Sequence, residues 1–304
     1  MGKLSKDRRD VYYRQAKQQG WRARSAYKLL QLNDEFDLFS GVTRAVDLCA
    51  APGSWSQVLA RTLRAPASSA ADAAASEARD RVIVAVDLQE MAPIEGVIAL
   101  RGDITSRHTA EAIVGLLGGR KAQLVVSDGA PDVTGLHDLD EYVQSQLLVA
   151  ALALATFVLE TGGAFVAKVF RGRDVSLLFA QFEVFFRDVV VAKPQSSRNQ
   201  SVEAFVVCRG FQLPEGYVPT FDLDVGAYRS ALRGAGGREP LTGPGRCIVP
   251  FVACGDLSET SGDPDRSYTL EEGSTFREPV QPPIRPAYQD AIEHRHAHAG
   301  GSAS

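Results

Sequence analysis

The stretch AVDLCAAPGSWSQVL, residues 45–59, decides the fold of this chain. It begins with a short apolar run that ends in Asp47, followed by a Pro52-Gly53 turn and a helical pattern that starts near Ser54. A strand, a tight turn and a helix in this order are typical of a βαβ unit. Gly53 permits close approach to the backbone, and the first turn of the helix offers N–H groups to a carboxylate or phosphate.

The alternation of apolar runs and helical segments continues to about residue 210. Runs such as VIVAV and LVVS are continuous rather than alternating, which is typical of strands covered on both faces. The pattern predicts an α/β fold: one Rossmann-like domain with a seven-stranded, mostly parallel sheet. The expected strands are 44–49, 81–88, 97–100, 124–127, 164–170, 189–192 and 204–208, and the expected helices are 22–36, 54–63, 106–117, 139–159 and 175–186.

Composition divides the chain into three regions. Residues 1–40 form a basic arm and a helix, and residues 41–210 form the α/β domain, interrupted by an alanine-rich, low-complexity insert at 65–80. Residues 211–304 hold ten of the fifteen prolines, so we expect an irregular, partly disordered tail. The apolar segment CIVPFVAC, 247–254, is the place where this tail is expected to dock.

The composition also excludes several classes of protein. With 45% hydrophobic and 23% charged residues over 304 positions, the chain is neither fibrous nor wholly disordered. Its four cysteines lack CxxC spacing, so we expect no metal site. The charged N-terminus is not a secretory signal, and the longest apolar run, 147–159, is shorter than the roughly 20 residues that span a bilayer. We therefore expect a cytoplasmic protein.

Acidic residues close four of the expected strands. Asp87, Asp103 and Asp128 follow the second, third and fourth strands as Asp47 follows the first. Each alone is typical of a helix cap or turn, but the carboxyl ends of parallel strands meet at one edge, where α/β sheets bind ligands. An acidic crevice suits a cationic ligand with ribose hydroxyls, such as S-adenosylmethionine. A nicotinamide cofactor is disfavoured because its G-x-G-x-x-G turn is missing.

A lysine in an apolar strand indicates a second site. Lys168 lies within AFVAKVF, and a buried lysine needs carboxylates nearby, which Asp128 and Glu203 can supply. Lys28 joins them if its helix folds over the sheet edge. The alternative is an ion pair that stabilises the fold and has no catalytic role. The functional hypothesis is that Lys168, as a neutral amine, removes the proton of a weakly acidic hydroxyl.

Six motifs together resemble the FtsJ-type RNA ribose 2′-O-methyltransferases. They are DLCAAPGSWSQ, VAVDLQ, GDIT, SDGAPDVTG, FVAKVFRG and SSRNQSVEAF. The resemblance implies a catalytic tetrad of Lys28, Asp128, Lys168 and Glu203, with Lys168 as general base. It also implies contacts with S-adenosylmethionine from Gly53, Trp55, Asp87, Asp103 and Asp128.

The opening 5–32 and the stretches TGLHDLDEY and KVFRGRD resemble more closely the eukaryotic subgroup that methylates the tRNA anticodon loop. That subgroup implies the wobble nucleotide and the nucleotide two before it (34 and 32) as targets. It also implies repeat-protein adaptors, of the WD-repeat or helical-repeat kind. Three alternatives stay open: a ribosomal RNA methyltransferase, a messenger-cap ribose methyltransferase, and a catalytically silent RNA-binding subunit.

The first 28 residues carry nine basic and two acidic side chains, whereas the whole chain has a net charge of −4. A basic arm on an acidic body indicates directed contact with a polyanion. Cations would neutralise phosphates and aromatic rings would stack on unpaired bases of an RNA loop. The expected RNA-contacting residues are Arg8, Arg9, Arg14, Lys17, Arg22 and Arg24, with Tyr12, Tyr13 and Trp21, and further along the chain Arg171, Arg173 and Arg198.

Replacing Arg8 and Arg9 with Glu should weaken RNA binding and leave cofactor affinity unchanged, because the arm contacts phosphates. Filter binding of RNA and calorimetric titration of the cofactor measure the two effects separately. An equal loss of both affinities would show that the arm is structural.

Overall fold

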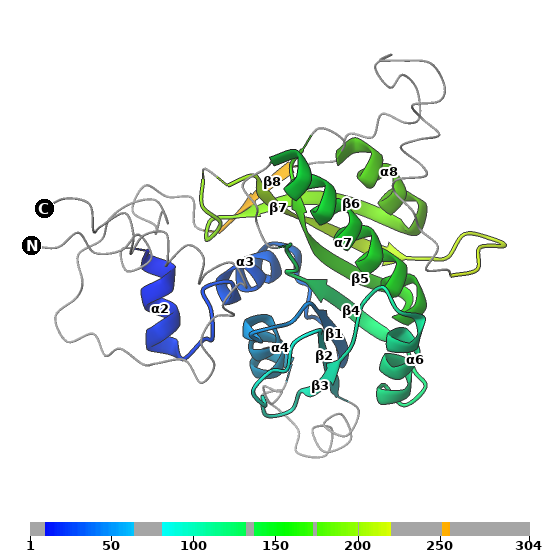
Figure 1. Ribbon diagram of the computed structural model, residues 1–304, viewed down its shortest axis with the longest axis horizontal. Coiled ribbons are helices and arrows are strands. Elements are labelled where there is room, and N and C mark those ends of the chain that lie inside the picture. Colours follow the sequence, from blue (N-terminus) through cyan, green and yellow to red (C-terminus); the bar gives the residue numbers. More distant parts are fainter. Residues whose placement is uncertain are drawn as a thin grey trace, which may run out of the picture.

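The computed structural model describes residues 10–63, 81–131, 137–172, 175–199, 201–219 and 251–255. Within these residues, eight strands form one sheet between two layers of helices (Figure 1). The helices are α2 (Val11–Gln19), α3 (Ala26–Phe36), α4 (Ser54–Leu63), α6 (Arg107–Leu116), α7 (His137–Val158) and α8 (Val175–Phe185). The strands are β1 (Arg44–Leu48), β2 (Val82–Asp87), β3 (Ile98–Arg101), β4 (Ala122–Ser127), β5 (Leu159–Phe170), β6 (Phe186–Pro194), β7 (Glu203–Phe211) and β8 (Phe251–Cys254).

The strand order is β3-β2-β1-β4-β5-β7-β6-β8. Strands β1 to β5 are parallel to one another, whereas β7 runs antiparallel between β5 and β6. Because β2 lies on one side of β1 and β4 on the other, the order reverses between β1 and β4. Such a switch point opens a crevice at the carboxyl ends of the strands, where α/β sheets bind their ligands.

The predicted α/β class and mostly parallel sheet are confirmed, with β8 as an additional strand. Residues 251–254 of the tail pair in parallel with β6, so the expected docking of 247–254 is confirmed for its second half. The insert 65–80 and the rest of the tail beyond residue 219 lie outside the described residues.

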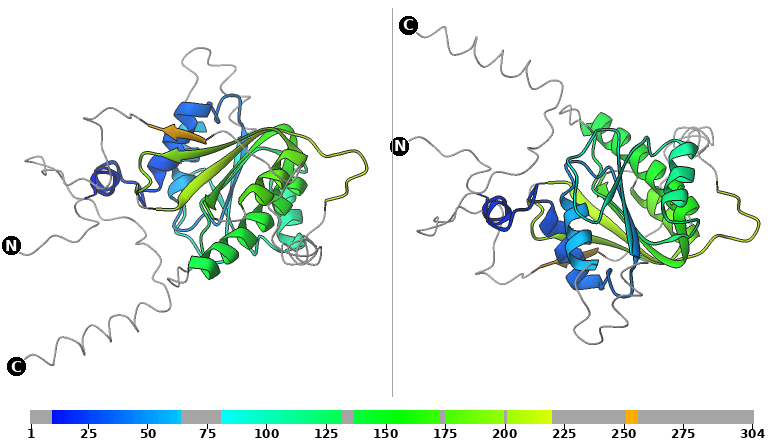
Figure 2. Two further views of the ribbon diagram at one scale, coloured as in Figure 1. Left: turned by 90° about the horizontal axis from the view of Figure 1, so that it is seen from above. Right: turned by 90° about the horizontal axis from the view of Figure 1, so that it is seen from below.

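Alternate residues of the central strands face different helix layers. In β1, Val46 and Leu48 pack in the cluster with α6, α7 and α8, whereas Ala45 packs in the cluster with α3 and α4. The two layers lie on opposite sides of the sheet (Figure 2). Residues 139–158 of α7 are long and apolar enough to cross a membrane by composition, but most of this stretch is buried inside the domain, as in a core helix.

The predicted helix over 22–36 is shorter, and a separate helix, α2, precedes it. Asp10 caps α2 by accepting a hydrogen bond from the Tyr13 N–H at 3.2 Å, and Gly20 ends it with φ 71°. The Arg61 guanidinium of α4 lies 3.9 Å from the ring centroid of Trp21, in the turn between α2 and α3. The arm from residue 10 onward is therefore docked onto the domain.

Candidate functional site

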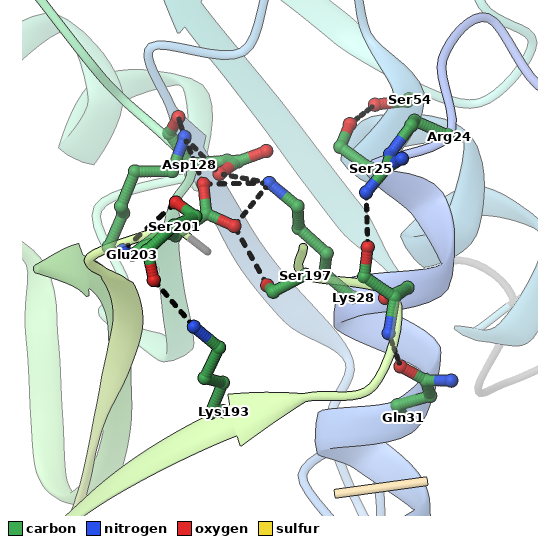
Figure 3. A network of polar contacts seen from close by, with 12 residues as sticks. Arg24, Ser25, Lys28, Gln31, Ser54, Asp128, Lys193, Ser197, Ser201 and Glu203 are labelled. Carbon is green, nitrogen blue, oxygen red and sulfur yellow. Dashed lines mark hydrogen bonds and ion pairs between the residues drawn. The ribbon is translucent and has the colours of Figure 1, made fainter. Parts of the chain in front are cut away.

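The structure brings together all four residues of the predicted tetrad, of which Figure 3 labels Lys28, Asp128 and Glu203. Lys28 Nζ lies 2.8 Å from Glu203 Oε1 and 3.7 Å from Asp128 Oδ1. Lys168 Nζ lies 2.6 Å from Asp128 Oδ1 and 3.3 Å from Glu203 Oε2, and it also donates a hydrogen bond to the Asp128 carbonyl. Each lysine therefore contacts both carboxylates.

Strand register explains why these side chains meet. In β5, Phe165, Ala167 and Val169 pack on the α6–α8 side, so Lys168 points to the opposite side, toward α3. Lys168 is paired with Phe205 of β7, and Glu203, two residues earlier, shares that face of the sheet. Lys28 reaches the same place from α3, and Asp128 directly follows β4.

Interactions with opposite charges keep Lys168 and Glu203 in their charged forms. Burial lowers the pKa of Lys168, but the carboxylates of Asp128 and Glu203 outweigh it and raise that pKa above its usual value. Burial raises the pKa of Glu203, but Lys28 and Lys168 outweigh this effect and hold it well below the usual range. Lys168 is thus an ammonium and Glu203 a carboxylate at neutral pH, so the neutral amine that the functional hypothesis requires is not the form that this arrangement favours.

Two further side chains hold the tetrad and were missed by the sequence analysis. Gln144 of α7 donates hydrogen bonds to the carbonyls of Gly129 (3.2 Å) and Lys168 (3.0 Å), which joins the ends of β4 and β5. The Ser197 hydroxyl donates to Glu203 Oε1 at 2.8 Å. Gln144 could have been noticed as a polar residue in an apolar helix, but the partner of Ser197 leaves no mark in the local sequence.

The turns after β1, β2 and β3 lie at the carboxyl edge of the sheet, beside the tetrad, and we call this edge the crevice. Gly53 has φ 102°, and a Cβ there would lie 2.8 Å from Ile94 Cδ1, so the turn requires glycine. The half-buried Asp87 carboxylate accepts the N–H groups of Ala51 and Gln89 at 2.9 and 2.8 Å. Asp103 is exposed and accepts from the N–H and the hydroxyl of Thr105.

Leu88, next to Asp87, is an apolar side chain that is 63% exposed at this crevice. Oriented carboxylates, the backbone N–H groups of the first turn of α4 and an exposed apolar side chain fit a ligand that combines hydroxyl groups, a charged end and a flat ring. Within the described ranges, no three His, Cys, Asp or Glu side chains converge as metal ligands would.

The Trp55 side chain does not line this crevice. It is 2% exposed, its ring lies 5.6 Å from that of Phe205, and its Nε1 donates to the Ser25 carbonyl at 2.8 Å. The indole fills the core between α3, α4 and the sheet, so the predicted cofactor contact of Trp55 stays a prediction that its side chain does not serve. Only its backbone N–H, in the first turn of α4, remains as a contact for a ligand.

Most of the described arm residues expected to contact RNA are turned inward, so this part of the prediction is wrong. Tyr12, Lys17 and Trp21 are buried. Arg22 is 5% exposed and donates to the carbonyls of Pro52 (2.8 Å) and Pro93 (2.9 Å), joining two turns that flank the crevice. Arg24 pairs with Asp10.

Tyr13 and Arg14 are half-buried, Arg171 is exposed and the Arg198 side chain is 35% exposed, so these four keep access to solvent. Arg8, Arg9 and Arg173 lie outside the described residues. RNA contact by the accessible residues stays a prediction.

The fold and the site together define a Rossmann-like α/β enzyme domain that binds a ligand at the switch point of its sheet. The chain belongs to the FtsJ-like methyltransferase family, which matches residues 21–211. The family and the enzyme class expected from the sequence are therefore confirmed.

Relatives resemble nearly the whole chain. A human protein named tRNA (cytidine(32)/guanosine(34)-2′-O)-methyltransferase is 57% identical over 96% of this chain and 84% of its own length. A Schizosaccharomyces pombe protein of the same name is 52% identical over 98% of this chain and 99% of its own. A crystal structure titled "ribosomal RNA methyltransferase, putative", from Plasmodium falciparum, aligns with a TM-score of 0.54 at 22% identity, over 64% of this chain and 100% of that one. That likeness shows the fold alone.

The Asp47 carboxyl lies beneath the crevice rather than in it. Its burial should make the free energy of unfolding depend on pH. It is 1% exposed and accepts a hydrogen bond from the Ser56 hydroxyl at 2.6 Å. Burial raises the pKa of Asp47 to about 7. The folded state thus holds this proton more tightly than the unfolded chain, and the free energy of unfolding should fall as pH rises from about 4 to about 7.

Asp47→Asn removes this titration and should therefore be more stable than the wild type above pH 7. The advantage should amount to about 1.4 kcal/mol for each unit of pKa difference and should vanish near pH 4. Urea unfolding of both proteins, free of ligand, at pH 4 to 8 measures it. A difference that stays constant with pH would show that Asp47 is ionised in the folded protein.

Proposed function

We propose that this protein transfers a methyl group from S-adenosylmethionine to the ribose 2′-hydroxyl of nucleotides 32 and 34 in the tRNA anticodon loop. The observation that carries the proposal is the tetrad: two lysines and two carboxylates within ion-pair distance, beside a crevice at the switch point of the sheet. Relatives named for this activity, which match nearly the whole chain, support the choice of substrate.

The residues proposed to hold the cofactor are those of the crevice. Asp87, oriented by two backbone N–H groups, is suited to ribose hydroxyls, and Leu88 is suited to the flat face of adenine. The Gly53 turn and the first turn of α4, which includes the Trp55 N–H, are suited to the carboxylate of the methionine part. Asp103 adds a further carboxylate, and Asp128 lies where crevice and tetrad meet.

S-adenosylmethionine supplies an electrophilic sulfonium methyl group, so the protein aligns the ribose oxygen and removes its proton. As the oxygen–carbon bond forms, the carbon–sulfur bond breaks and sulfur keeps the electron pair. The hydroxyl proton passes to Lys168 Nζ, which must first release a proton of its own to solvent. Lys28, Asp128 and Glu203 hold that nitrogen in place.

The alternative substrates are ribosomal RNA and the messenger cap, because the same tetrad would serve any ribose 2′-hydroxyl. The match to proteins named as tRNA methyltransferases, over 84% and 99% of their own lengths, favours tRNA. We also propose that repeat-protein adaptors, of the WD-repeat or helical-repeat kind, present the tRNA and that the protein works in the cytoplasm. Both of these rest on the sequence analysis.

Mapping ribose methylation nucleotide by nucleotide in cells lacking this protein tests the substrate. We expect 2′-O-methylation to disappear at tRNA positions 32 and 34 and to return with the wild-type chain. Ribosomal RNA and messenger caps from the same cells are the controls. Loss of methylation there, with tRNA unchanged, would contradict the proposal and favour the alternatives.

Lys168→Ala should lower methyl transfer by about 10²- to 10⁴-fold, the usual contribution of a general base. Its melting temperature should still rise with S-adenosylmethionine and not with NAD, because the crevice is intact. Lys168→Arg keeps the positive charge, but a guanidinium does not lose its proton at these pH values. This variant should be as inactive as Lys168→Ala. Near-normal activity would show that Lys168 orients the hydroxyl and does not remove its proton.

A further inference from the structure

The segment between β6 and β7 lies against the tetrad and is held from the helix that carries Lys28. The Ser196 N–H donates to Gln31 Oε1 at 2.9 Å, and the Arg24 guanidinium donates to the Ser196 carbonyl. Both backbone groups of the fully buried Ser196 are thus bound by side chains from α3 and the turn before it, those of Gln31 and Arg24, which Figure 3 labels. We call Arg24, Gln31 and Ser196 the clamp.

The clamp fixes the next residue, Ser197, against the tetrad. Ser197 is 1% exposed, its N–H donates to the Pro194 carbonyl at 2.9 Å, and its hydroxyl donates to Glu203 Oε1 at 2.8 Å. The same Oε1 lies 2.8 Å from Lys28 Nζ. One carboxylate oxygen therefore binds a flexible lysine and a serine whose position is set by the backbone.

We propose that Ser197 is a positioning residue for methyl transfer: held by Arg24 and Gln31 through Ser196, its hydroxyl fixes the Glu203 carboxylate between Lys28 and Lys168. This inference rests on the proposed function and adds to it a link between α3 and β7. Lysine alone is a poor anchor, because its ammonium is a point charge on a flexible stem. A serine in a buried turn has one position and removes that freedom.

The Ser197 hydroxyl also weakens the electrostatic attraction of the Glu203 carboxylate for the two lysines. A hydrogen bond donated to a carboxylate stabilises its negative charge and weakens its attraction for the lysines. Without it, Glu203 should hold Lys168 in the charged form up to higher pH. The charged groups that contact Glu203 are Lys28 from α3 and Lys168 from β5, and both also contact Asp128 after β4. Farther out, Lys193 of β6 donates to the Ser201 carbonyl, and Arg24 and Arg198 pair with Asp10.

Ser197→Ala in the full chain, purified with its cellular partners, tests the proposal. We expect the turnover number on tRNA to fall about ten- to a hundredfold, because a misplaced catalytic group lowers the rate by about this factor. The KM values for tRNA and S-adenosylmethionine should stay within about twofold of wild type. The rise of turnover with pH should move to higher pH. Ser145→Ala removes a buried hydroxyl that donates to the Tyr142 carbonyl at 2.6 Å and should change neither quantity.

Gln31→Met, nearly isosteric, removes the acceptor of the clamp without touching Glu203. It should reproduce the loss of turnover in part, and adding it to Ser197→Ala should cost nothing more, because both act through one hydrogen bond. If Ser197→Ala does not fold, Gln31→Met still tests the proposal. A pH profile like that of Ser145→Ala, or losses that multiply in the double variant, would overturn the proposal.

A readout without RNA separates this inference from the proposed function. In urea unfolding of the ligand-free protein, the Ser197→Ala and Gln31→Met effects on the unfolding constant should be non-additive, whereas Ser145→Ala and Gln31→Met should be additive. Absence of tRNA methylation by the wild type, with this coupling present, would refute the substrate and leave the clamp. Additive effects in both pairs would refute the clamp.

Discussion

Two ammonium groups and two carboxylates share one largely buried space, with every lysine nitrogen within 3.7 Å of both carboxylates. Burying a charge without a partner costs several kcal/mol, so these four groups are stable only together. Their charges balance, and each comes from a different element: α3, the end of β4, β5 and β7. The charge balance therefore requires all four elements to be docked at once, including β7, inserted antiparallel between β5 and β6.

The same balance bears on the chemistry. A carboxylate pair that holds Lys168 in place also keeps it protonated, which opposes its use as a base. Under the proposed function, a sulfonium bound next to Asp128 brings a further positive charge. Like charges disfavour each other, so cofactor binding itself lowers the pKa of the lysine and promotes release of its proton. The site is stable when empty, and the bound cofactor would raise the fraction of Lys168 that is present as the neutral amine.

The sequence predicts best those features that depend on strand ends and burial. Asp128, Lys168 and Glu203 were predictable because a buried lysine in an apolar strand requires carboxylates at the same sheet edge. Arg22 and Arg24 were assigned to RNA because charge is visible in a sequence and its direction is not. Their acceptors are the carbonyls of Pro52, Pro93 and Ser196, 30, 71 and 172 positions away, and backbone carbonyls carry no residue-type signal.

Helix α2 and strand β8, at the two ends of the described chain, were hard to predict for the same reason. Both also support the turn that carries Ser197. Helix α2, with nine residues, and strand β8, with four, are too short to be stable alone, so only tertiary contacts form them. Both meet at Gln195, whose side chain accepts from the Tyr12 hydroxyl at 3.2 Å and whose N–H donates to the Cys254 carbonyl at 2.7 Å. The turn that carries Ser197 is therefore held by α2, α3 and β8 together. A group that must position a carboxylate needs such rigidity, and here segments from both ends of the chain provide it.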